Sequence, residues 1–587
     1  MSETNYWDRW ALRKSSRRKA LLSAGAGAAG VAALGAFGCG DDAKKESGGG
    51  TPGGGITPGS GGSSPAAAPT LPDHPLYKGL PGGKRGGKYV FAQSDAPVGA
   101  DPHSYEVPGT HSMVQPVYNG LFFLWPQDPV RPTIMGELVE KWEQPSNTET
   151  VLHLRKGVRF QDVDPVNGRE FTSDDVVFNI KRMQDQRPEN RLRGMYTPIS
   201  AVEPIDKHTV RLKLSEPFAP LLTNLANTWA AMVAKELVDK GDIDRKAIGT
   251  GGFILDRWER GVSVAWKRNP NYWKAGLPFF DSMEMQVISD RALREAKYLA
   301  KEVDNGAINL VGTNEDTIKK QKDEITQKVG GTFRELNNSF VAIIHVYFNI
   351  PQKPFDDPRV RKAFQAAIAY DQVIKLFAGR AIRTGPISSG NLPWALPEAD
   401  LPKFDPAEAK QLLTAAGFPD GLTTETWVSS EYSGAAFAPL VAGLLKPHGI
   451  NVGIKQLENA QWISEVYRGQ GKYPMTSHAD ATFDDPDRIL YEYFHSKGAA
   501  NHTNLKDPKM DELAAKQRRE LDTKVRQDLV REAQKYILDQ GYDVPIVSPG
   551  SIQAIPPWLT SIDIRTGISD SYRVRDLMHV NGGPRAS

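Results

Sequence analysis

The stretch "FVAIIHVYFNIPQKPFDDPRVRKAFQAAI" (Phe340–Ile368) places a strand signal directly before a helix signal. Its first part is an uninterrupted apolar run, which is typical of a strand covered on both faces. Asp357 and Pro358 then form a typical helix start, an N-cap followed by proline at the first helical position. Val360 and Phe364 begin an apolar stripe with helical spacing. The stretch therefore predicts a buried strand followed by an amphipathic helix.

Similar strand and helix signals interleave along the rest of the chain. Three segments alternate apolar and polar residues in the manner of half-buried strands: "TVRLKL" (Thr209–Leu214), "SVAWKRN" (Ser263–Asn269) and "SMEMQVI" (Ser282–Ile288). Helix starts are predicted at capping residues: Thr172 with Asp175, Asp371, Asp405, Asp507 and Asp522. Because strands and helices alternate throughout, the sequence predicts an α/β fold with mixed sheets.

An export signal is predicted for residues 1–39. A basic head is followed by an uncharged run rich in Ala and Gly (Ala20–Gly38) and then by Cys39. Arg17 and Arg18 resemble a twin-arginine signal, and Sec export is the alternative. The residues before Cys39 resemble a bacterial lipobox, which predicts cleavage before this cysteine and lipidation of its thiol. The alternative is a cysteine that is removed with the signal.

Residues 40–87 are predicted to form a flexible tether, because Gly, Ser and Pro leave too few apolar residues for a core. The body that follows, residues 88–587, is long enough for two or three structural domains. A net charge of +2 predicts no nucleic-acid partner. The body contains no apolar run long enough to span a bilayer. Together these features predict an extracytoplasmic protein that is attached to the membrane by a lipid.

The usual motifs for catalysis and metal binding are absent from the sequence. It contains no Gly-x-Ser-x-Gly elbow, no Walker A motif and no His-Glu-x-x-His. With one cysteine, the chain forms no internal disulfide and no cysteine-based metal site. The histidine pairs His103/His111 and His495/His502 are interpreted as ordinary surface residues. We therefore predict no catalytic residue, no metal site and no cofactor. A secreted hydrolase is the alternative of a different class.

Six blocks stand in a fixed order between residues 88 and 580. They are "ADPH" (Ala100–His103), "VYNGLF" (Val117–Phe122) and the segments Leu152–Arg182, Gly249–Trp273, Tyr347–Ile374 and Asn504–Ile537. Together they resemble the extracytoplasmic solute-binding proteins of ABC importers, family 5, which includes oligopeptide-, dipeptide- and nickel-binding proteins.

The resemblance implies a fold of the periplasmic-binding-protein type II class, with two lobes around a cleft and an extra domain inserted in the first lobe. The implied boundaries are residues 88–123, 201–330 and 553–587 for lobe I, 124–200 for the inserted domain, and 331–552 for lobe II. The interleaved strands and helices are compatible with this arrangement.

The resemblance also implies a function. Such a protein is a monomer that closes by a hinge around a peptide or similar small polar solute. The closed form then delivers the solute to a membrane permease driven by an ATPase. An oligosaccharide or a nickel chelate is the alternative ligand within the family.

Finally, the resemblance implies ligand-binding residues. Asp480 in "SHADATFDDP" matches an aspartate that pairs with the α-ammonium of bound peptides in relatives, although Ser477 stands where those relatives have Trp. Backbone groups of Thr476, Ser477 and His478 are expected to pair with an extended ligand as an added strand does. The alternative for Asp480 is that it caps a turn.

Three further residues are expected to contact the ligand. Trp462 matches an aromatic residue that lines the pocket, and Val107 matches a position where lobe I supplies a backbone contact. Trp427 is a further aromatic candidate, which would stack on a sugar if the ligand were an oligosaccharide. The alternative for Trp462 is a place in the core.

Overall fold

The computed structural model describes most of the globular body. The described residues are 85–105, 108–125, 133–187, 190, 193–305, 309–310, 315–335, 342–389, 393–430, 433–467, 469, 471–481, 485–550, 552–560 and 579–580. The predictions for the export signal, Cys39, Val107 and the tether up to residue 84 therefore lie outside the described residues.

One four-stranded sheet joins strands from distant parts of the sequence. It is formed, in this order, by β1 (Lys88–Gln93), β10 (Ser282–Val287), β9 (Ser263–Arg268) and β8 (Phe253–Glu259). β1 pairs in parallel with β10. The alternating residues Val264 and Trp266 of β9, and Met283 and Met285 of β10, are buried. The two predicted strands are therefore confirmed.

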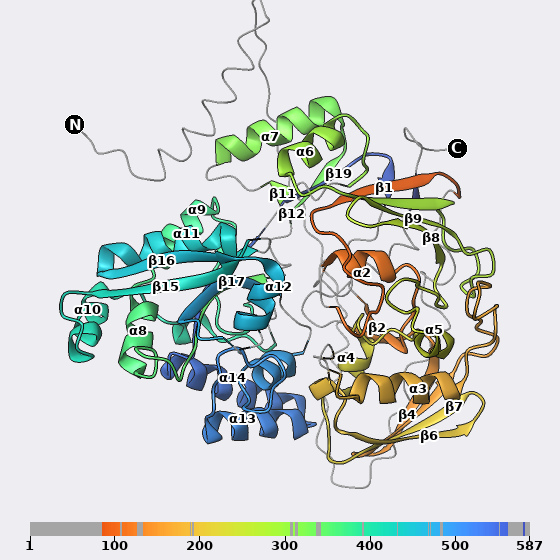
Figure 1. The fold of residues 1–587 in the computed structure, drawn as a ribbon, viewed down its shortest axis with the longest axis horizontal. Coiled ribbons are helices and arrows are strands. Elements are labelled where there is room, and N and C mark those ends of the chain that lie inside the picture. Colours follow the sequence, from red (N-terminus) through yellow and green to blue (C-terminus); the bar gives the residue numbers. More distant parts are fainter. Residues whose placement is uncertain are drawn as a thin grey trace, which may run out of the picture. The chain divides into compact units, whose positions relative to one another are not determined.

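A second four-stranded sheet is formed, in this order, by β4 (Val139–Ser146), β5 (Glu149–Leu154), β7 (Thr209–Leu214) and β6 (Ile199–Asp206). β7 is the predicted "TVRLKL" strand. The helix α3 (Ser173–Gln184) packs on β6 and β7 (Figure 1). The backbone N–H of Thr172 donates to the Asp175 carboxylate at 2.9 Å, so the predicted capping box at the start of α3 is confirmed.

The opening stretch contributes the strand β13 (Ala342–Phe348) to a six-stranded sheet. The sheet order is β14 (Ala381–Ile382), β18 (Asp543–Pro549), β13, β17 (Met475–Ala481), β15 (Leu422–Ser429) and β16 (Ile450–Leu457). β13 pairs antiparallel with β17 and β18, and all its residues after Ala342 are buried. This central position explains the uninterrupted apolar run. The helix α11 (Ser433–Leu445) packs on β15, β16 and β17 (Figure 1).

Four helices begin at the predicted aspartate caps. They are α8 (Pro358–Ala366), α10 (Pro406–Ala415), α13 (Pro508–Arg519) and α14 (Thr523–Asp539). In each, the preceding aspartate accepts a hydrogen bond from a backbone N–H of the first turn. The prediction for Asp371 is wrong, because α9 (Tyr370–Leu376) begins before it with Ala369 as N-cap. Asp371 lies in the first turn, where the helix dipole favours a carboxylate.

The remaining described strands form one three-stranded and two two-stranded sheets, and the remaining described helices lie between the strands in the sequence. The helical ones are α2 (Pro108–Val114), η1 (Arg193–Met195), α4 (Leu221–Ala226), α5 (Lys235–Asp239), α6 (Arg291–Leu299), α7 (Glu315–Lys328), η2 (Glu398–Asp400), η3 (Lys446–His448), α12 (Asn459–Trp462), η4 (Ile463–Tyr467) and η5 (Arg488–Tyr493). The strands are β2 (Phe122–Trp125), β3 (Thr133–Gly136), β11 (Asn309–Leu310), β12 (Thr332–Glu335), β19 (Ile552–Ile555), β20 (Leu559–Thr560) and β21 (His579–Val580).

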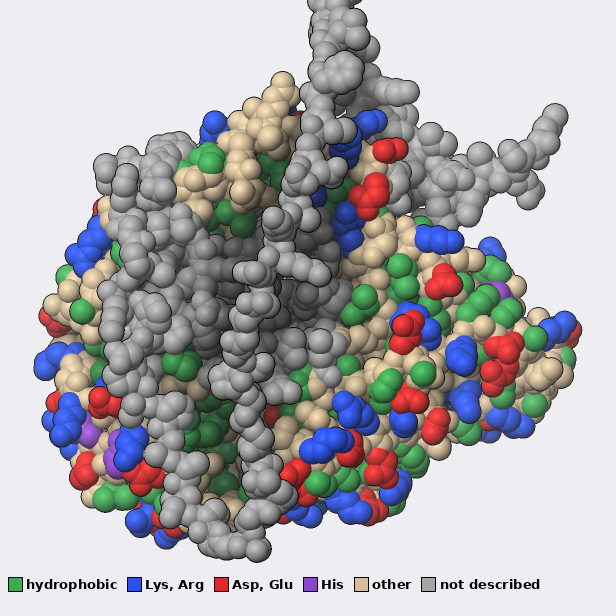
Figure 2. Space-filling model, turned by 180° about the vertical axis from the view of Figure 1, so that it is seen from behind, with side chains coloured by type: hydrophobic (Ala, Val, Ile, Leu, Met, Phe, Trp, Pro, Cys, Tyr) green, Lys and Arg blue, Asp and Glu red, His purple; other side chains and the backbone are tan. Residues whose placement is uncertain are grey.

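Charged side chains of both signs are interspersed on the surface. On the face drawn in Figure 2, Lys and Arg side chains alternate with Asp and Glu side chains. A nucleic-acid surface needs a concentrated positive patch, which this mixture does not supply among the described residues of this face. Every helix within the described part of the chain is too short or too polar to cross a bilayer.

Candidate functional site

A row of buried polar side chains lies on one face of the six-stranded sheet. Thr476, His478 and Asp480 are two residues apart on β17, so their side chains point to the same face. The register places His345 of β13 opposite His478, and Tyr347 opposite Thr476. Directly opposite residues share a face of the sheet, so β13 adds its imidazole and phenol to the row. All five residues are buried.

His478, Asp480 and His502 converge within this row. His478 Nε2 lies 3.2 Å from Asp480 Oδ1. One nitrogen or oxygen atom from each of the three side chains lies within 4.8 Å of the other two. His502 comes from the connection between η5 and α13. The exposed fractions of His478, Asp480 and His502 are 4%, 7% and 0%. The cluster therefore joins three chemistry-bearing groups in a nearly dry environment.

Two members of the cluster have a buried polar atom without a hydrogen-bond partner in the described part of the chain: Asp480 Oδ2 and His502 Nε2. The other ring nitrogen of His502, Nδ1, lies 2.9 Å from the carbonyl oxygen of Ala500. Because a carbonyl only accepts, Nδ1 carries the proton and Nε2 presents its lone pair. Buried atoms without partners are rare, so their convergence indicates a place for a bound water, ion or ligand.

Aromatic rings enclose the two imidazoles. Tyr347 meets His502 edge-on, with ring centres 4.5 Å apart, and Tyr467 stacks on His502 at 5.7 Å. Trp462 meets His478 edge-on at 5.3 Å. These apolar ring faces lower the local dielectric constant, which strengthens polar contacts inside the cluster and makes an unpaired charge there costly.

A second carboxylate–imidazole pair lies beside the cluster. His345 Nδ1 lies 2.9 and 3.0 Å from the two carboxylate oxygens of Asp543, at the start of β18. Both side chains are almost completely buried. Burial raises the pKa of Asp543 although His345 acts in the opposite direction, and the charge of Asp480 adds to the rise. The charge of Asp480 and the protonation of Asp543 are therefore linked.

Burial and neighbouring charges set the protonation of the cluster. Burial alone would raise the pKa of Asp480, but the nearby imidazoles, His478 first among them, outweigh it and hold this pKa below its ordinary range. Burial lowers the pKa of His502 to about 4. At neutral pH the cluster thus contains an aspartate anion beside a neutral His502. A buried anion is costly without a positive partner, and the imidazole of His478, 3.2 Å from the carboxylate, is the first of the groups that stabilise it here.

The structure brings together Thr476, His478, Asp480 and Trp462 among the predicted site residues. Trp462 is buried, as the core alternative predicts, and it also contacts His478. Ser477 points to the opposite face, where its hydroxyl lies 3.1 Å from that of Thr426. β13 pairs with β17 along its full length, so an added ligand strand is restricted to the other edge, where β15 registers with β17 at Met475. Backbone pairing with a ligand stays a prediction.

Trp427 has a different environment from the cluster. It is half-buried, and the ammonium nitrogen of Lys455 lies 3.4 Å from the centre of its ring. Its carbonyl oxygen accepts a hydrogen bond of 3.2 Å from Trp462 Nε1. Because a cation covers one ring face, that face is not available for stacking a sugar.

The interpretation of four histidines as surface residues is wrong. His103, His111, His495 and His502 are all buried. His103 illustrates the reason: its Nε2 lies 2.9 Å from the carbonyl oxygen of Ala231, which supplies a partner from a distant part of the chain. His502 was missed as a site residue for the same cause, since no local pattern distinguishes it. His345 was missed although it lies inside the predicted strand.

Two buried ion pairs fix the chain shortly after β17. Arg526 of α14 donates to Asp485 through Nη1 at 2.9 Å and Nη2 at 2.5 Å. Arg518 of α13 donates to Asp487 through Nη2 at 2.8 Å and Nε at 3.1 Å. Gln517 joins them, because it donates to Asp487 and accepts from Arg526. This network attaches the segment behind Asp480 to two helices.

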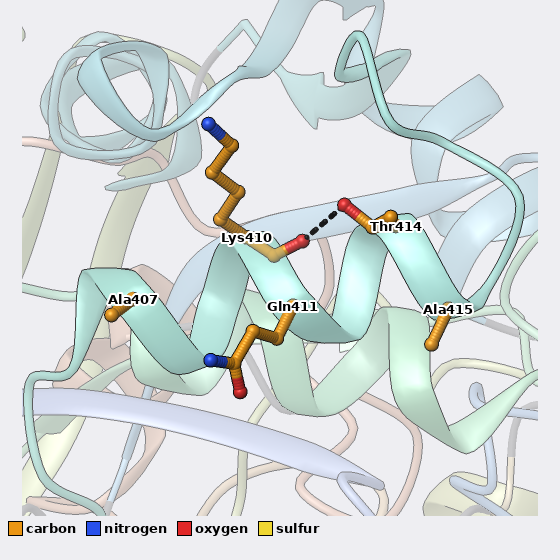
Figure 3. Close-up of a pocket in the computed structure, with 5 residues that line it drawn as sticks. All are labelled: Ala407, Lys410, Gln411, Thr414 and Ala415. Atoms are coloured by element: carbon orange, nitrogen blue, oxygen red, sulfur yellow. Dashed lines mark hydrogen bonds between the residues drawn. The ribbon is translucent and has the colours of Figure 1, made fainter.

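A surface pocket over α10 is a poorer candidate. Its lining consists of Ala407, Lys410, Gln411, Thr414 and Ala415, all from the same helix (Figure 3). The Thr414 hydroxyl donates to the Lys410 carbonyl at 2.8 Å, so this polar group is already paired within the helix. Ligand sites usually bring polar groups together from several elements.

Comparison with known families gives one model that matches residues 133–501, well over half of the chain: "Bacterial extracellular solute-binding proteins, family 5 Middle". Among characterised relatives, a di/tripeptide-binding protein of Pseudomonas aeruginosa is 29% identical over 77% of this chain and 88% of the relative. A glutathione-binding protein of Salmonella choleraesuis is 27% identical over 81% of this chain and 92% of the relative. Both relatives are named as binding proteins.

Solved structures share the fold. The periplasmic binding protein DppA of Helicobacter pylori, in complex with the peptide STSA, has a TM-score of 0.73 and 23% identity and covers 85% of this chain and 99% of its own. NikZ of Campylobacter jejuni, in complex with Ni(L-His), has a TM-score of 0.71 and 17% identity and covers 84% and 99%. The fold is therefore that of the type II periplasmic binding proteins, as predicted.

Proposed function

We propose that this chain, which belongs to the bacterial extracellular solute-binding proteins of family 5, captures short peptides for an ABC importer. One observation carries the proposal: the buried carboxylate of Asp480 presents Oδ2 without a hydrogen-bond partner among the described residues. The α-ammonium of a peptide supplies both a positive charge and N–H donors for this oxygen. The relatives named for di/tripeptides and glutathione support a ligand with a free amine.

The proposed mechanism is capture by closure. Lobe I (residues 88–123, 201–330 and 553–587, with the inserted domain 124–200) and lobe II (331–552) close around the peptide as a monomer. Closure excludes water, and the ammonium–carboxylate contact then strengthens because the local dielectric constant falls. A membrane permease and its ATPase receive the closed form. We further propose that Cys39 carries a lipid and that residues 40–87 tether the body outside the cytoplasmic membrane.

Calorimetry with paired peptides tests the role of Asp480. Asp480→Asn keeps the shape of the side chain and removes its charge. A charge-assisted hydrogen bond contributes about 1.5–3 kcal/mol, so we expect affinity for a free-amine tripeptide to fall at least about tenfold. Affinity for the N-acetylated form of the same tripeptide should not change. Exposed Asp420 in the same predicted lobe provides the matched control Asp420→Asn, which should bind both peptides normally.

Two results would remove the proposal. Equal losses for the free and the acetylated peptide would show that Asp480 does not receive the ammonium. Shortened peptides recovered by mass spectrometry after incubation with the protein would show turnover in place of capture. Intact recovery together with amine-selective loss is the expected outcome.

A further inference from the structure

We infer that His478, Asp480 and His502 form a three-ligand site for a divalent transition-metal ion, built by the protein alone without a chelating solute. The three side chains already present one atom each within 4.8 Å of the others. Imidazole nitrogen and carboxylate oxygen together suit ions such as Zn²⁺ and Ni²⁺. The inference does not depend on the importer role, since it uses only side chains of this chain.

The spacing of the ligand atoms is close to that of a metal site. Zinc bonds of about 2.0–2.2 Å to nitrogen and oxygen place neighbouring ligand atoms about 3.4 Å apart in a tetrahedral arrangement. His478 Nε2 and Asp480 Oδ1 are 3.2 Å apart, so this pair needs no rearrangement. Since the ligand atoms lie within 4.8 Å of one another, the His502 ring has to approach by at most about 1.4 Å to reach tetrahedral spacing. Three coordinating side chains leave the fourth position of the metal ion open for a water molecule or for an atom of a bound solute.

Hydrogen bonds outside the site orient the imidazoles. His502 Nδ1 is paired with the Ala500 carbonyl at 2.9 Å, which turns Nε2 toward the cluster as a lone-pair donor. His478 Nδ1 lies 3.4 Å from Thr476 Oγ1, and its Nε2 likewise faces Asp480. Metal-binding histidines commonly have this arrangement, with one nitrogen held by an outer partner and the other on the metal.

The buried orphan atoms give the second, independent argument. Asp480 Oδ2 and His502 Nε2 lack hydrogen-bond partners in the described part of the chain, and the contact of His478 Nε2 is the one with Asp480 Oδ1 at 3.2 Å. An ammonium group also offers three N–H donors to these atoms, but it needs acceptors at about 2.9 Å, whereas a metal ion binds its ligand atoms at about 2.1 Å. The metal ion and the peptide ammonium therefore compete for Asp480.

Zinc titration of tag-free protein tests the site. After dialysis against EDTA and removal of the chelator, wild-type protein should bind one Zn²⁺ per chain in competition with a chromophoric chelator. His502→Gln and His478→Gln should each weaken binding at least about tenfold, as loss of a direct ligand should exceed the tenfold cost of losing an outer partner. His153, which is partly exposed and lies on β5, provides the control His153→Gln, which should bind normally.

X-ray absorption spectroscopy of the zinc-loaded wild type uses no variant, so its result does not depend on whether a variant folds. It should show two imidazoles and a carboxylate oxygen around the ion. A first shell with fewer than two imidazoles, no zinc binding, or unchanged binding by folded His502→Gln would overturn the inference.

The zinc and peptide experiments can each overturn one proposal without overturning the other. Absent zinc binding with amine-selective dependence on Asp480 overturns the metal site and leaves the peptide proposal standing. Zinc binding by a protein that takes up no peptide supports the metal site and contradicts the peptide proposal. When both are bound, saturating zinc should weaken binding of the free-amine tripeptide more than that of its acetylated form.

Discussion

Arg526→Met should destabilise the protein far more than a matched change on the same helix. Arg526 and Asp485 form a bidentate ion pair with distances of 2.5 and 2.9 Å, and their side chains are only 6% and 8% exposed. Methionine keeps much of the apolar stem of arginine but leaves the Asp485 carboxylate buried without its cation. Removing one partner of a buried pair costs about 3–5 kcal/mol.

The expected change is large enough for a thermal melt. For a unit of 150–250 residues, 1 kcal/mol shifts the melting temperature by about 2–4 °C, so Arg526→Met should lower it by roughly 6–20 °C. Lys524 on α14 is the control, since its pair with Asp528 is 2.8 Å long but 71% and 60% exposed. Lys524→Met should leave the melting temperature nearly unchanged, because an exposed ion pair contributes little to stability.

A double variant separates the orphaned charge from the lost packing. In Arg526→Met with Asp485→Asn, the neutral amide needs no cation, and its oxygen still accepts the 2.9 Å hydrogen bond from the Asp487 backbone N–H. We expect this variant to recover much of the lost stability, because the two sites are in contact and their effects are not additive. Equal melting temperatures for Arg526→Met and Lys524→Met would refute the reasoning, as would a double variant less stable than Arg526→Met.

Two further predictions concern stability away from the candidate site. Burial lowers the pKa of His111 to about 3, so this histidine contributes stability that is complete above pH 6.5 and is lost as the pH falls. At pH 5 the free energy of unfolding is lower by about 2 kcal/mol for this reason. The urea midpoint of His111→Phe should therefore fall less between pH 7.5 and pH 5 than that of the wild type, and equal falls in the two proteins would contradict this. Gly421→Ala should destabilise more than Gly417→Ala in urea unfolding. Both glycines have positive φ, so alanine is strained at either position. Only at Gly421 would the new Cβ also collide with a backbone atom, the carbonyl oxygen of Gly449. Equal losses of stability in the two variants would show that this collision has no effect.

Local signals made much of the secondary structure predictable. The caps at Asp357, Asp405 and Asp507 were correct because an N-cap depends on a few neighbouring residues, all visible in the sequence. The strand β13 was predictable because its central position leaves no polar face. Asp371 failed as a cap because the helix begins before it, and boundaries are the least certain part of such a prediction.

The candidate site depended on contacts that no local pattern contains. The alternation of Thr476, His478 and Asp480 on β17 was visible, but its meaning comes from the strand opposite and from His502. His345 and Asp543 are separated by 198 positions in the chain and meet only because β13 and β18 pair. A histidine in a polar sequence context suggests a surface position, and only the fold shows that His502 is buried.

The same nonlocal assembly explains why we propose two different cations for one acidic residue. Asp480 alone, as the sequence presents it, is a carboxylate for an ammonium group. Once β13 pairing and the return of the chain at His502 enclose it, its surroundings include the imidazoles of His478 and His502, and imidazole is a common metal ligand. Because an ammonium needs acceptors at about 2.9 Å and a metal needs them at about 2.1 Å, a modest movement of His502 decides which cation fits. Under the two proposals, the position of His502 would therefore matter for the preferred cation as much as Asp480 does.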